Sequence, residues 1–507
     1  MLPVVVGFAV ACNAILGIED VALDPNRGDA ADAGPEAGDP TCAPSPRDDP
    51  KVIREACGIF ATPNGSDANA GTRTSPVKTL RHALELASAQ RLGRVYLCAS
   101  TYPEQLLIAH EDALFGISVY GGLSCPDGPA PWTFTGEPAK VQPKDASLIA
   151  LRVDDAPGQV TIDGIQFAAS DAAEAGKSSV AGYVTSSSSV AIRHASLAAG
   201  SGRDATSAPA ADPPTQDPSD FTGNSGNANG HGGPAKVCSC KQGQVTTTTT
   251  GGKGGDSDAE RGGSGLPALG GGLGGANAPS LCGRDGAQDG GSGAAGANGA
   301  PGKHGTDAGV GSIGVGGWTP AQGLAGENGG IGQGGGGGRG GTCSDPPPDH
   351  AEGGGGGGCG GCGGTGGAGG AGGGASIALL LKDANVSLLD VALTAKVGGG
   401  GARGTTGLDA PALGTAGQPG LGACGCPGGN GGQGGHGGSG GGGAGGVSVG
   451  IVYSGPVPVL DALTQDKIHV AHGGAGGPGG DGAEPGRDGV AQPTLNVGPT
   501  QPLHATP

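Results

Sequence analysis

Aromatic side chains are scarce in this chain. Trp, Tyr and Phe make up 3% of its 507 residues, and charged residues make up 14%. This composition excludes a large core filled by aromatic rings, but it allows a narrow core of Val, Ile, Leu and Ala. No apolar run reaches the ~20 residues that a membrane-spanning helix requires.

Basic residues are also in the minority. The formal net charge is −18, which argues against nucleic acid and against an anionic membrane surface as binding partners. Part of this charge lies in one polar stretch, from Asp20 to Glu55. A solvated linker explains that stretch as well as an acidic functional face does.

Glycine and cysteine are abundant instead. The 118 glycines are roughly three times the usual share of about 7%. Thirteen cysteines are many for a reducing compartment, where disulfides are rare. Cys12 has a separate explanation, given below, and the even twelve that remain suit paired disulfides in an oxidising setting.

A repeated unit organises the folded part of the chain. Each unit has two short runs rich in Val, Ile and Leu, joined by a small polar turn, and this pattern predicts stacked coils of parallel strands. One coil cannot bury its apolar face, but a stack of coils can. The second runs are Val160–Phe167, Val190–Leu197, Val386–Leu393 and Val457–Thr464, and the runs before them are Ile149–Val153, Val180–Val184, Ile377–Leu381 and Val447–Val452.

The N-terminus resembles that of a bacterial lipoprotein. Ala9-Val10-Ala11 precedes Cys12, as small residues do in a lipobox. The resemblance implies cleavage before Cys12, a diacylglycerol on its sulfur, and, with Asn13 next, retention in the outer membrane. The apolar run is short and lacks a preceding Lys or Arg, which a start site upstream of Met1 would explain. A short buried strand is the alternative.

A capping helix is predicted before the first coils. Ser75 suits the N-cap and Pro76 the first helical position. Apolar residues at helical spacing follow over 77–92, and Gly93 suits the stop. Such a helix can cover the open end of a strand stack.

This region resembles a known family. The run Gly65–Thr72 (Gly-Ser-Asp-Ala-Asn-Ala-Gly-Thr), with Thr79-Leu80 and Ala83-Leu84, is similar to the N-terminal cap of right-handed parallel β-helix proteins of the pectin-lyase-like superfamily. The resemblance covers residues 57–200 and, through the repeats, 375–397 and 447–472. It implies a β-helix, in a group that includes many bacterial surface proteins.

Low-complexity sequence leaves the predicted stack at the same corner each time and contains a period of three. That period matches polyproline II, whose bare glycine faces allow close packing and hydrogen bonds between helices. The pattern is similar to the Gly-rich bundle of snow flea antifreeze proteins and to Gly-rich domains of mycobacterial surface proteins. For 200–356, a disordered glycine linker is the alternative. The residues that recur between glycine pairs are Cys359, Cys362, Thr365, Ala368 and Ala371, then Asn430, Gln433, His436 and Ser439.

The cysteine positions suggest disulfides more than metal. Cys98 and Cys125 lie at strand ends about one coil apart, which favours a staple between coils. Three close pairs would link neighbouring Gly-rich excursions. The Cys359–Cys362 spacing also suits zinc, but a second such pair is missing. The three pairs are Cys238 with Cys240, Cys359 with Cys362, and Cys424 with Cys426.

Two further sites are candidates for chemistry. Asp67 and Asn69 could hold calcium loosely, or they could cap a turn. His194, Asp390 and Asp461 fall in one column, at the place of Gly164. Since adjacent coils are about 4.8 Å apart, Asp390 and Asp461 could form a carboxylate pair as in glycoside hydrolysis. A polar turn ladder is the alternative.

The predicted fold is therefore all-β, a right-handed parallel β-helix with a short capping helix and with excursions from one face that are polyproline II-like or disordered. The chain divides into a signal segment (1–11), an anchor cysteine with an acidic linker (12–56), the cap and first coils (57–200), a Gly-rich insertion (201–374), a coil (375–397), a second insertion (398–446), the last coil (447–472) and a Gly/Pro-rich tail (473–507).

Two functions fit this organisation. The first is a non-catalytic cell-surface lipoprotein of the outer membrane, whose scaffold presents Gly-rich lobes to polysaccharide, matrix or envelope. The second is a polysaccharide lyase or glycoside hydrolase that uses the Asp column. The scarcity of aromatics favours the first. No cofactor and no nucleic acid partner is expected. The arrangement of residues around Asp390 and Asp461 distinguishes the two functions.

Overall fold

The fold is built almost entirely of β-structure. Among the residues described, the chain forms two α-helices, α1 (Leu80–Ala89) and α2 (Ala462–Asp466), and neither is long and apolar enough to cross a membrane. The all-β class predicted from the sequence is therefore confirmed. The computed structural model describes residues 40–126, 130–213, 218–242, 245–257, 260–276, 282, 291–307, 309–343, 350–411, 413–415, 417 and 425–498.

Three parallel sheets form the body of the molecule. The first contains β1 (Ile59–Ala61), β2 (Arg94–Cys98), β5 (Ile117–Ser124), β9 (Gln159–Asp163), β12 (Ser189–Arg193), β21 (Val386–Leu389) and β24 (Val459–Leu460), with β6 (Thr133–Phe134) added antiparallel to β5. The second contains β3 (Thr101–Tyr102), β7 (Ala139–Val141), β10 (Ile165–Ala168), β13 (Ser196–Ala198), β22 (Ala392–Ala395) and β25 (Ile468–Val470). The third contains β4 (Leu106–Ile108), β8 (Leu151–Asp154), β11 (Ser179–Thr185), β20 (Ser376–Lys382), β23 (Ser448–Ser454) and β26 (Ala491–Asn496).

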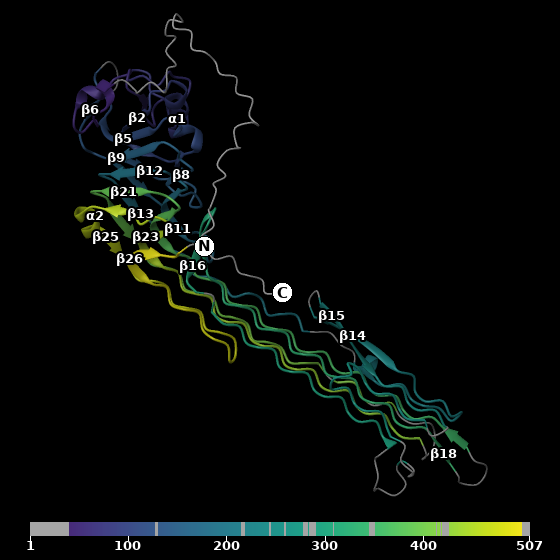
Figure 1. Cartoon of the computed structure of the whole chain (residues 1–507). Helices are drawn as coiled ribbons and strands as arrows, with labels where there is room; N and C mark the ends of the chain where they lie inside the picture. The colour runs from purple at the N-terminus through teal and green to yellow at the C-terminus, as the bar shows by residue number, and fades with distance from the viewer. Residues whose placement is uncertain are drawn as a thin grey trace, which may run out of the picture.

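The chain visits these sheets in rotation. From β8 onward it supplies one strand to the third, the first and the second sheet in turn, and it completes this order four times before it ends at β26. Equivalent residues of successive rounds therefore lie side by side. Val190 pairs with Val160 on one side and with Val386 on the other. Figure 1 shows these rounds as the layered upper part of the molecule, the stack.

The interior of the stack is a narrow column of aliphatic side chains. Ile162, Ile192 and Leu388 pair in register across β9, β12 and β21, and all three are buried in one continuous cluster. Alternate residues of each strand point inward because side chains alternate across a sheet. The repeats seen in the sequence thus mark residues that face a common core.

Helix α1 closes the N-terminal end of this core with Leu80, Leu84 and Ala87. It begins later than predicted: Thr79, not Ser75, is its N-cap, with the Thr79 hydroxyl 3.2 Å from the N–H of His82. The predicted first helical position, Pro76, and the predicted end at residue 92 are therefore wrong. Residues before Thr79 belong to a turn, since Val77 forms a parallel bridge with the edge of β1.

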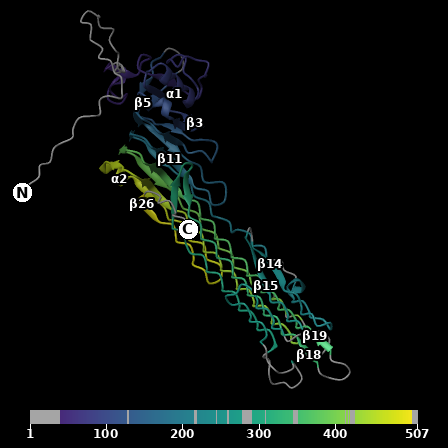
Figure 2. The same cartoon turned by 45° about the vertical axis from the view of Figure 1, so that its right-hand side comes forward.

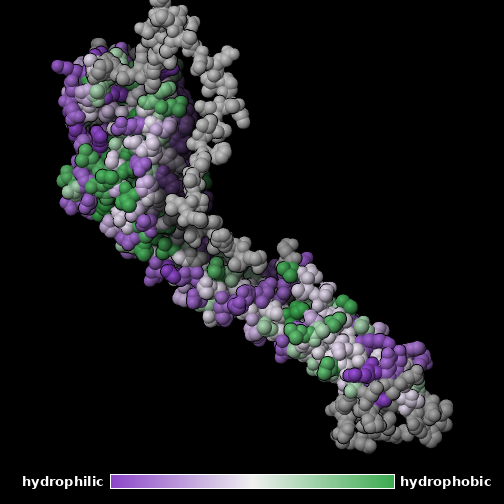
Figure 3. Space-filling view, viewed as in Figure 1, coloured by the Kyte–Doolittle hydropathy of each residue, from purple (hydrophilic) through white to green (hydrophobic). Residues whose placement is uncertain are grey.

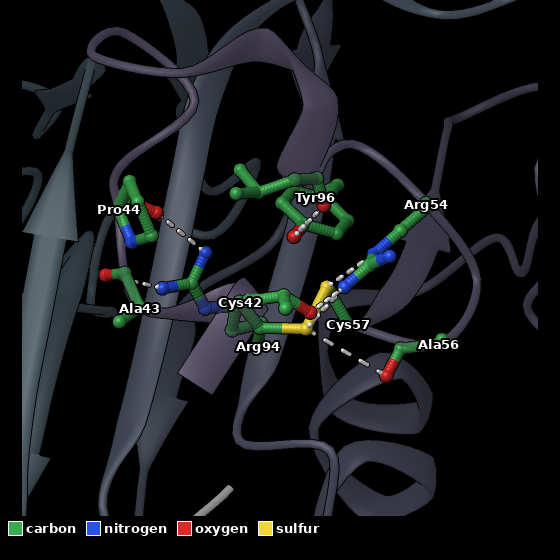
Figure 4. The surroundings of a disulfide bond; sticks show 10 residues. Cys42, Ala43, Pro44, Arg54, Ala56, Cys57, Arg94 and Tyr96 are labelled. Carbon is green, nitrogen blue, oxygen red and sulfur yellow. Dashed lines mark hydrogen bonds between the residues drawn. A yellow bond between two sulfur atoms is a disulfide. The ribbon is translucent and has the colours of Figure 1, made fainter. Parts of the chain in front are cut away.

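The outer face of the first sheet is covered near this end by residues 40–57, the N-terminal strap. A disulfide between Cys42 and Cys57 closes the strap, and Tyr96 donates a hydrogen bond of 2.6 Å to the carbonyl oxygen of Val52. Arg94 donates to two further carbonyl oxygens of the strap, each at 2.9 Å (Figure 4). Several aromatic side chains gather beneath it, among them Phe60, Tyr96 and Trp132.

The Gly-rich excursions leave the stack at one corner. Each follows a strand of the second sheet, β13, β22 or β25, and each returns to the third sheet, at β20, β23 or β26. Together they form an elongated lobe that runs away from the stack (Figures 1 and 2). The longest excursion contains hairpins β14–β15 (Lys236–Gln242 and Val245–Gly251), β16–β17 (Gly311–Gly314 and Gly317–Pro320) and β18–β19 (Gly341–Cys343 and His350–Glu352).

Hairpin β16–β17 folds back onto the stack. Its Ile313 and Trp318 are buried against the outer face of the third sheet, in a cluster that includes Tyr183. The Tyr183 hydroxyl donates a hydrogen bond of 2.6 Å to the carbonyl oxygen of Gly314. The hairpin therefore ties the lobe to the stack.

The last round departs from the predicted repeat. Its strand in the first sheet, β24, has only two residues, and the segment after it is helix α2 rather than strand. The register also differs by one residue, since Leu388 pairs with Leu460. The tail then supplies a strand that the sequence did not suggest, β26, which pairs with β23.

Candidate functional site

The predicted column lies at the corner between the first and second sheets. Gly164, His194 and Asp390 follow β9, β12 and β21, and their φ angles are +71°, +44° and +54°. Glycine adopts this left-handed conformation freely, and Asp and His are among the other residues that tolerate it. The column is thus a ladder of turn residues.

Asp461 does not belong to this column, so the predicted grouping is wrong for this residue. It is the N-cap of α2, and its carboxylate accepts a hydrogen bond of 2.9 Å from the N–H of Thr464. The same carboxylate accepts the N–H of Asp390 at 3.2 Å. Hydrogen bonds from Thr464, side chain first and backbone second, hold the pKa of Asp461 below its ordinary value. An ionised helix cap is unsuited to act as a general acid.

Asp390 has a cationic partner. Its carboxylate forms an ion pair with Lys467, which follows α2. Asp390 and Asp461 therefore do not form two free carboxylates that flank a ligand, as glycoside hydrolysis requires. One carboxylate neutralises a lysine, and the other caps a helix.

His194 is held by a carboxylate that the sequence did not suggest. Its Nδ1 lies 3.0 Å from Oδ1 of Asp163, a buried residue at the end of β9. Arg47 of the N-terminal strap lies 3.8 Å from the same oxygen. Because an ionised carboxylate can only accept, Nδ1 of His194 is the donor in this contact, which fixes the orientation of the ring.

These residues surround an open cleft of about 270 Å³ at the corner, the corner cleft. Its lining is mostly polar. The cleft can take a small polar ligand, and His194 could accept a proton there, but both cations that face it are engaged by carboxylates. The lining residues are Arg47, Gly136, Pro138, Gln166, His194, Ala195, Ser196, Asp390 and Lys467.

The lobe is the second feature with functional potential. Its Gly-rich segments are hydrogen-bonded to one another at every third residue, which is the period predicted from the sequence. Gly361, Gly364, Gly367 and Gly370 donate to Gly432, Gly435, Gly438 and Gly441, at 2.8 to 2.9 Å. The interpretation of these stretches as a structureless linker is therefore wrong for the described residues.

Segment 425–447 lies at the centre of the lobe. Its backbone is hydrogen-bonded to five other Gly-rich segments, which surround it. The central position explains why its glycines cannot be replaced, since a Cβ at Gly434 would overlap the carbonyl oxygen of Cys362. The five segments are 291–307, 321–340, 353–375, 398–417 and 473–490.

Along one edge of segment 425–447, exposed non-glycine residues lie where none of the five Gly-rich segments packs against it. Asn430, Gln433 and His436 are exposed on one edge. Further along the same edge, Gly442 and Gly445 are buried where segment 473–490 covers them. The period-three position thus carries a side chain where it faces solvent, at residues 430, 433 and 436, and glycine where another backbone lies against it, at 442 and 445. Ser439, between the two groups, is buried and accepts a hydrogen bond of 3.1 Å from the N–H of Gly407.

Polar side chains complete the hydrogen bonding at the edges of the lobe. The N–H of Gly366 donates to Asn328 at 2.8 Å, and the N–H of Gln433 donates to Asn298 at 2.8 Å. Such side chains replace missing neighbours, because a buried N–H without a partner is costly.

Disulfides are present within the stack and within the lobe. Cys98 is bonded to Cys125, as predicted. One disulfide links two excursions as predicted, although through Cys282 of the first and Cys426 of the second. Cys238–Cys359 and Cys240–Cys362 instead join segments within the first excursion, so the predicted link between excursions is wrong for these four residues. Cys12 and Cys424 lie outside the described residues.

Asp67 and Asn69 serve the turn before α1. Asp67 accepts hydrogen bonds of 2.9 Å from the N–H groups of Lys78 and Thr79, and Asn69 donates its amide to the carbonyl oxygen of Pro76 at 2.8 Å. The described part of the chain brings together no group of three His, Cys, Asp or Glu residues that could hold a metal ion.

Several contributors to these sites were missed in the sequence. Arg47, Asp163 and Lys467 are distant from one another in the chain, and no motif joins them. The register of the repeats could have indicated Asp163, since it lies one residue before Gly164 and pairs with Arg193. The strap disulfide was missed because its loop belongs to the polar segment assigned to a linker.

Comparisons with protein families, with curated proteins and with solved structures found no match to this chain.

Proposed function

We propose that this chain is a non-catalytic bacterial cell-surface lipoprotein, anchored through Cys12 in the outer membrane. In this proposal, the three-sheet stack is a right-handed parallel β-helix related to the pectin-lyase-like superfamily. The lobe is the part that contacts polysaccharide, matrix or envelope. The stack then serves as a mount that holds the lobe.

The construction of the lobe carries this proposal. A linker needs no hydrogen bonds, whereas this lobe is hydrogen-bonded at every third residue and is linked by three disulfides. Disulfides of this number suit an oxidising compartment, such as the cell envelope or the exterior. A rigid object of this kind loses little conformational entropy when it binds.

The corner column supports a non-catalytic role. Asp390 is neutralised by Lys467, and Asp461 caps α2. Each carboxylate therefore has a structural task that accounts for its position. The alternative of a polysaccharide lyase or hydrolase rests on the corner cleft, where His194 lies beside Asp163.

An attachment assay with cells that display the protein tests the proposal. Cells with the wild-type chain and cells with the Gln433→Val variant should attach equally to a polysaccharide-coated surface. The Gly434→Val variant should lose attachment, since its side chain would overlap the backbone at Cys362. The Cys12→Ser variant should lose palmitate labelling and appear in the medium.

Equal attachment of Gly434→Val and wild-type cells would contradict a role for the lobe, and palmitate labelling of Cys12→Ser would contradict the anchor. Release of reducing ends from an acidic polysaccharide, abolished by His194→Ala, would instead support the enzyme.

A further inference from the structure

An exposed apolar surface lies on the lobe around hairpin β14–β15. Val237, Leu266, Leu269 and Leu273 form this lobe patch, with 67%, 48%, 93% and 70% of their respective surfaces exposed. Figure 3 shows hydrophobic side chains on the surface of this part of the lobe. Exposed apolar residues that are grouped together often mark a contact surface.

Three neighbouring strands direct the patch outward. Val237 pairs with Thr250, and Thr250 exchanges backbone hydrogen bonds of 3.0 and 2.8 Å with Leu266. Paired residues of adjacent strands share one face of a sheet, so Val237 and Leu266 lie on the same side. The opposite side of β14 carries Cys238 and Cys240, whose disulfides hold it against the lobe.

The leucines belong to a second, tighter turn. Gly265 donates a backbone hydrogen bond of 2.9 Å to Gly272, so residues between them form a loop with Leu269 at its tip. A partner protein would need a pocket to receive a leucine that projects from a turn, and a flat protein surface offers none. It can enter a bilayer without one, since acyl chains close around it.

The charges beside the patch also suit a membrane. Hairpin β14–β15 carries Lys236 and Lys241 and no carboxylate, although the whole chain has a net charge of −18. Lys241 shares the outward face of β14 with Val237, because alternate residues point the same way. Acidic surface elsewhere repels anionic headgroups, which restricts a membrane contact to this area.

We propose that the lobe patch is a membrane-contact surface, which lays its leucines into the interfacial region of a lipid bilayer while Lys241 meets lipid phosphates. The contact is independent of the proposed anchor at Cys12. It gives the protein a second, non-covalent attachment, on the lobe.

Vesicle sedimentation with the full chain carrying Cys12→Ser tests this proposal, because that chain cannot be lipidated. It should bind vesicles of phosphatidylcholine with phosphatidylglycerol. Leu269→Ser together with Leu273→Ser should lower the bound fraction about tenfold. Lys241→Gln should lower binding to the anionic vesicles and leave binding to pure phosphatidylcholine unchanged. Val459→Ser, a control at an exposed apolar residue of the stack, should bind like the parent.

Failure of the parent to bind vesicles, or equal binding by the double leucine variant, would overturn the proposal. Sedimentation velocity without lipid tests whether a second copy of the chain, instead of a bilayer, covers the patch. A dimer that Leu269→Ser dissociates would show that a second copy occupies the patch. Neither result bears on palmitate labelling of Cys12, so failure here is distinguishable from failure of the anchor.

Discussion

At the scale of single residues, Asp67 shows how one carboxylate organises a chain end. Burial alone would raise its pKa, but hydrogen bonds from Thr79 and Lys78 outweigh this effect and lower the pKa below its ordinary value. The lowered pKa means that the ionised form binds these N–H groups better in the folded state than in the unfolded state. Asp67 thus orders the turn that positions α1.

We expect Asp67→Asn to lower stability by about 1 kcal/mol at pH 7, a modest value because the site is exposed and screened. A group with a lowered folded pKa stabilises the protein above its unfolded pKa, about 3.9 for Asp. That contribution disappears as the pH falls through the folded pKa. The thermal melts of parent and variant should therefore differ at pH 7, and the difference should be smaller at pH 3.

A constant difference between the two proteins at both pH values would show that the charge of Asp67 does not matter. Ala70→Ser, a change at an exposed residue of the same loop that leaves the Asp67 contacts in place, serves as the control. It should behave like the parent at both values.

At the scale of strands, the buried column of aliphatic side chains leads to a prediction about stability. Ile162→Asp or Leu388→Asp would place an unpaired carboxylate in the buried cluster, and this should cost several kcal/mol. Ser387→Asp, on the exposed face of the same strand β21, should change stability little. Urea unfolding of the three variants measures the difference, and a Leu388→Asp variant as stable as Ser387→Asp would refute the assignment of the core.

The Gly-rich segments make the second prediction at this scale. A Cβ at Gly366 would overlap the carbonyl oxygen of Gly326, and one at Gly434 would overlap that of Cys362. Gly366→Val and Gly434→Val should therefore lower the melting temperature. Thr365→Val and Gln433→Val should be nearly silent, because these positions already accommodate a side chain. Thr365→Val removes only a long hydrogen bond of 3.5 Å to the carbonyl oxygen of Asp212.

The sign of the change in melting temperature distinguishes a packed lobe from a flexible one. In a solvated chain, replacement of glycine restricts the unfolded state and stabilises slightly. Melting temperatures of the glycine variants equal to or above those of their neighbours would therefore rule out the packed arrangement.

At the scale of the whole molecule, two disulfides constrain the unfolded chain in nearly the same way. Cys238–Cys359 and Cys240–Cys362 close loops of 121 and 122 residues that are nearly the same loop. A loop of about 100 residues contributes up to ~4.7 kcal/mol through the entropy of the unfolded chain. The second bond adds little to this, because the first has already closed the loop.

Removal of one pair, with Cys240→Ser and Cys362→Ser together, should thus change the free energy of unfolding only slightly. Removal of both pairs should cost about 4 kcal/mol. Guanidinium unfolding of the two variants measures both values. Equal losses from each pair would mean that local strain or packing, rather than loop closure, sets their contribution.

The sequence by itself determined the class of fold, the composition of the core and the period of the lobe. These properties are local: alternation of apolar residues places Ile162 and Leu388 inside, and glycine at fixed spacing permits backbone to lie against backbone. The disulfide between Cys98 and Cys125 followed from their places at strand ends.

Only the tertiary structure decided which distant residues meet. Asp163 with His194 and Asp390 with Lys467 are brought together by the register of rounds that are separated in the chain. The pairing of Cys238 with Cys359 depends on a hairpin that folds onto a Gly-rich segment. Asp461 became a helix cap because the last round shifts by one residue. Contacts of this kind arise from the packing of the whole chain, and no local pattern contains them.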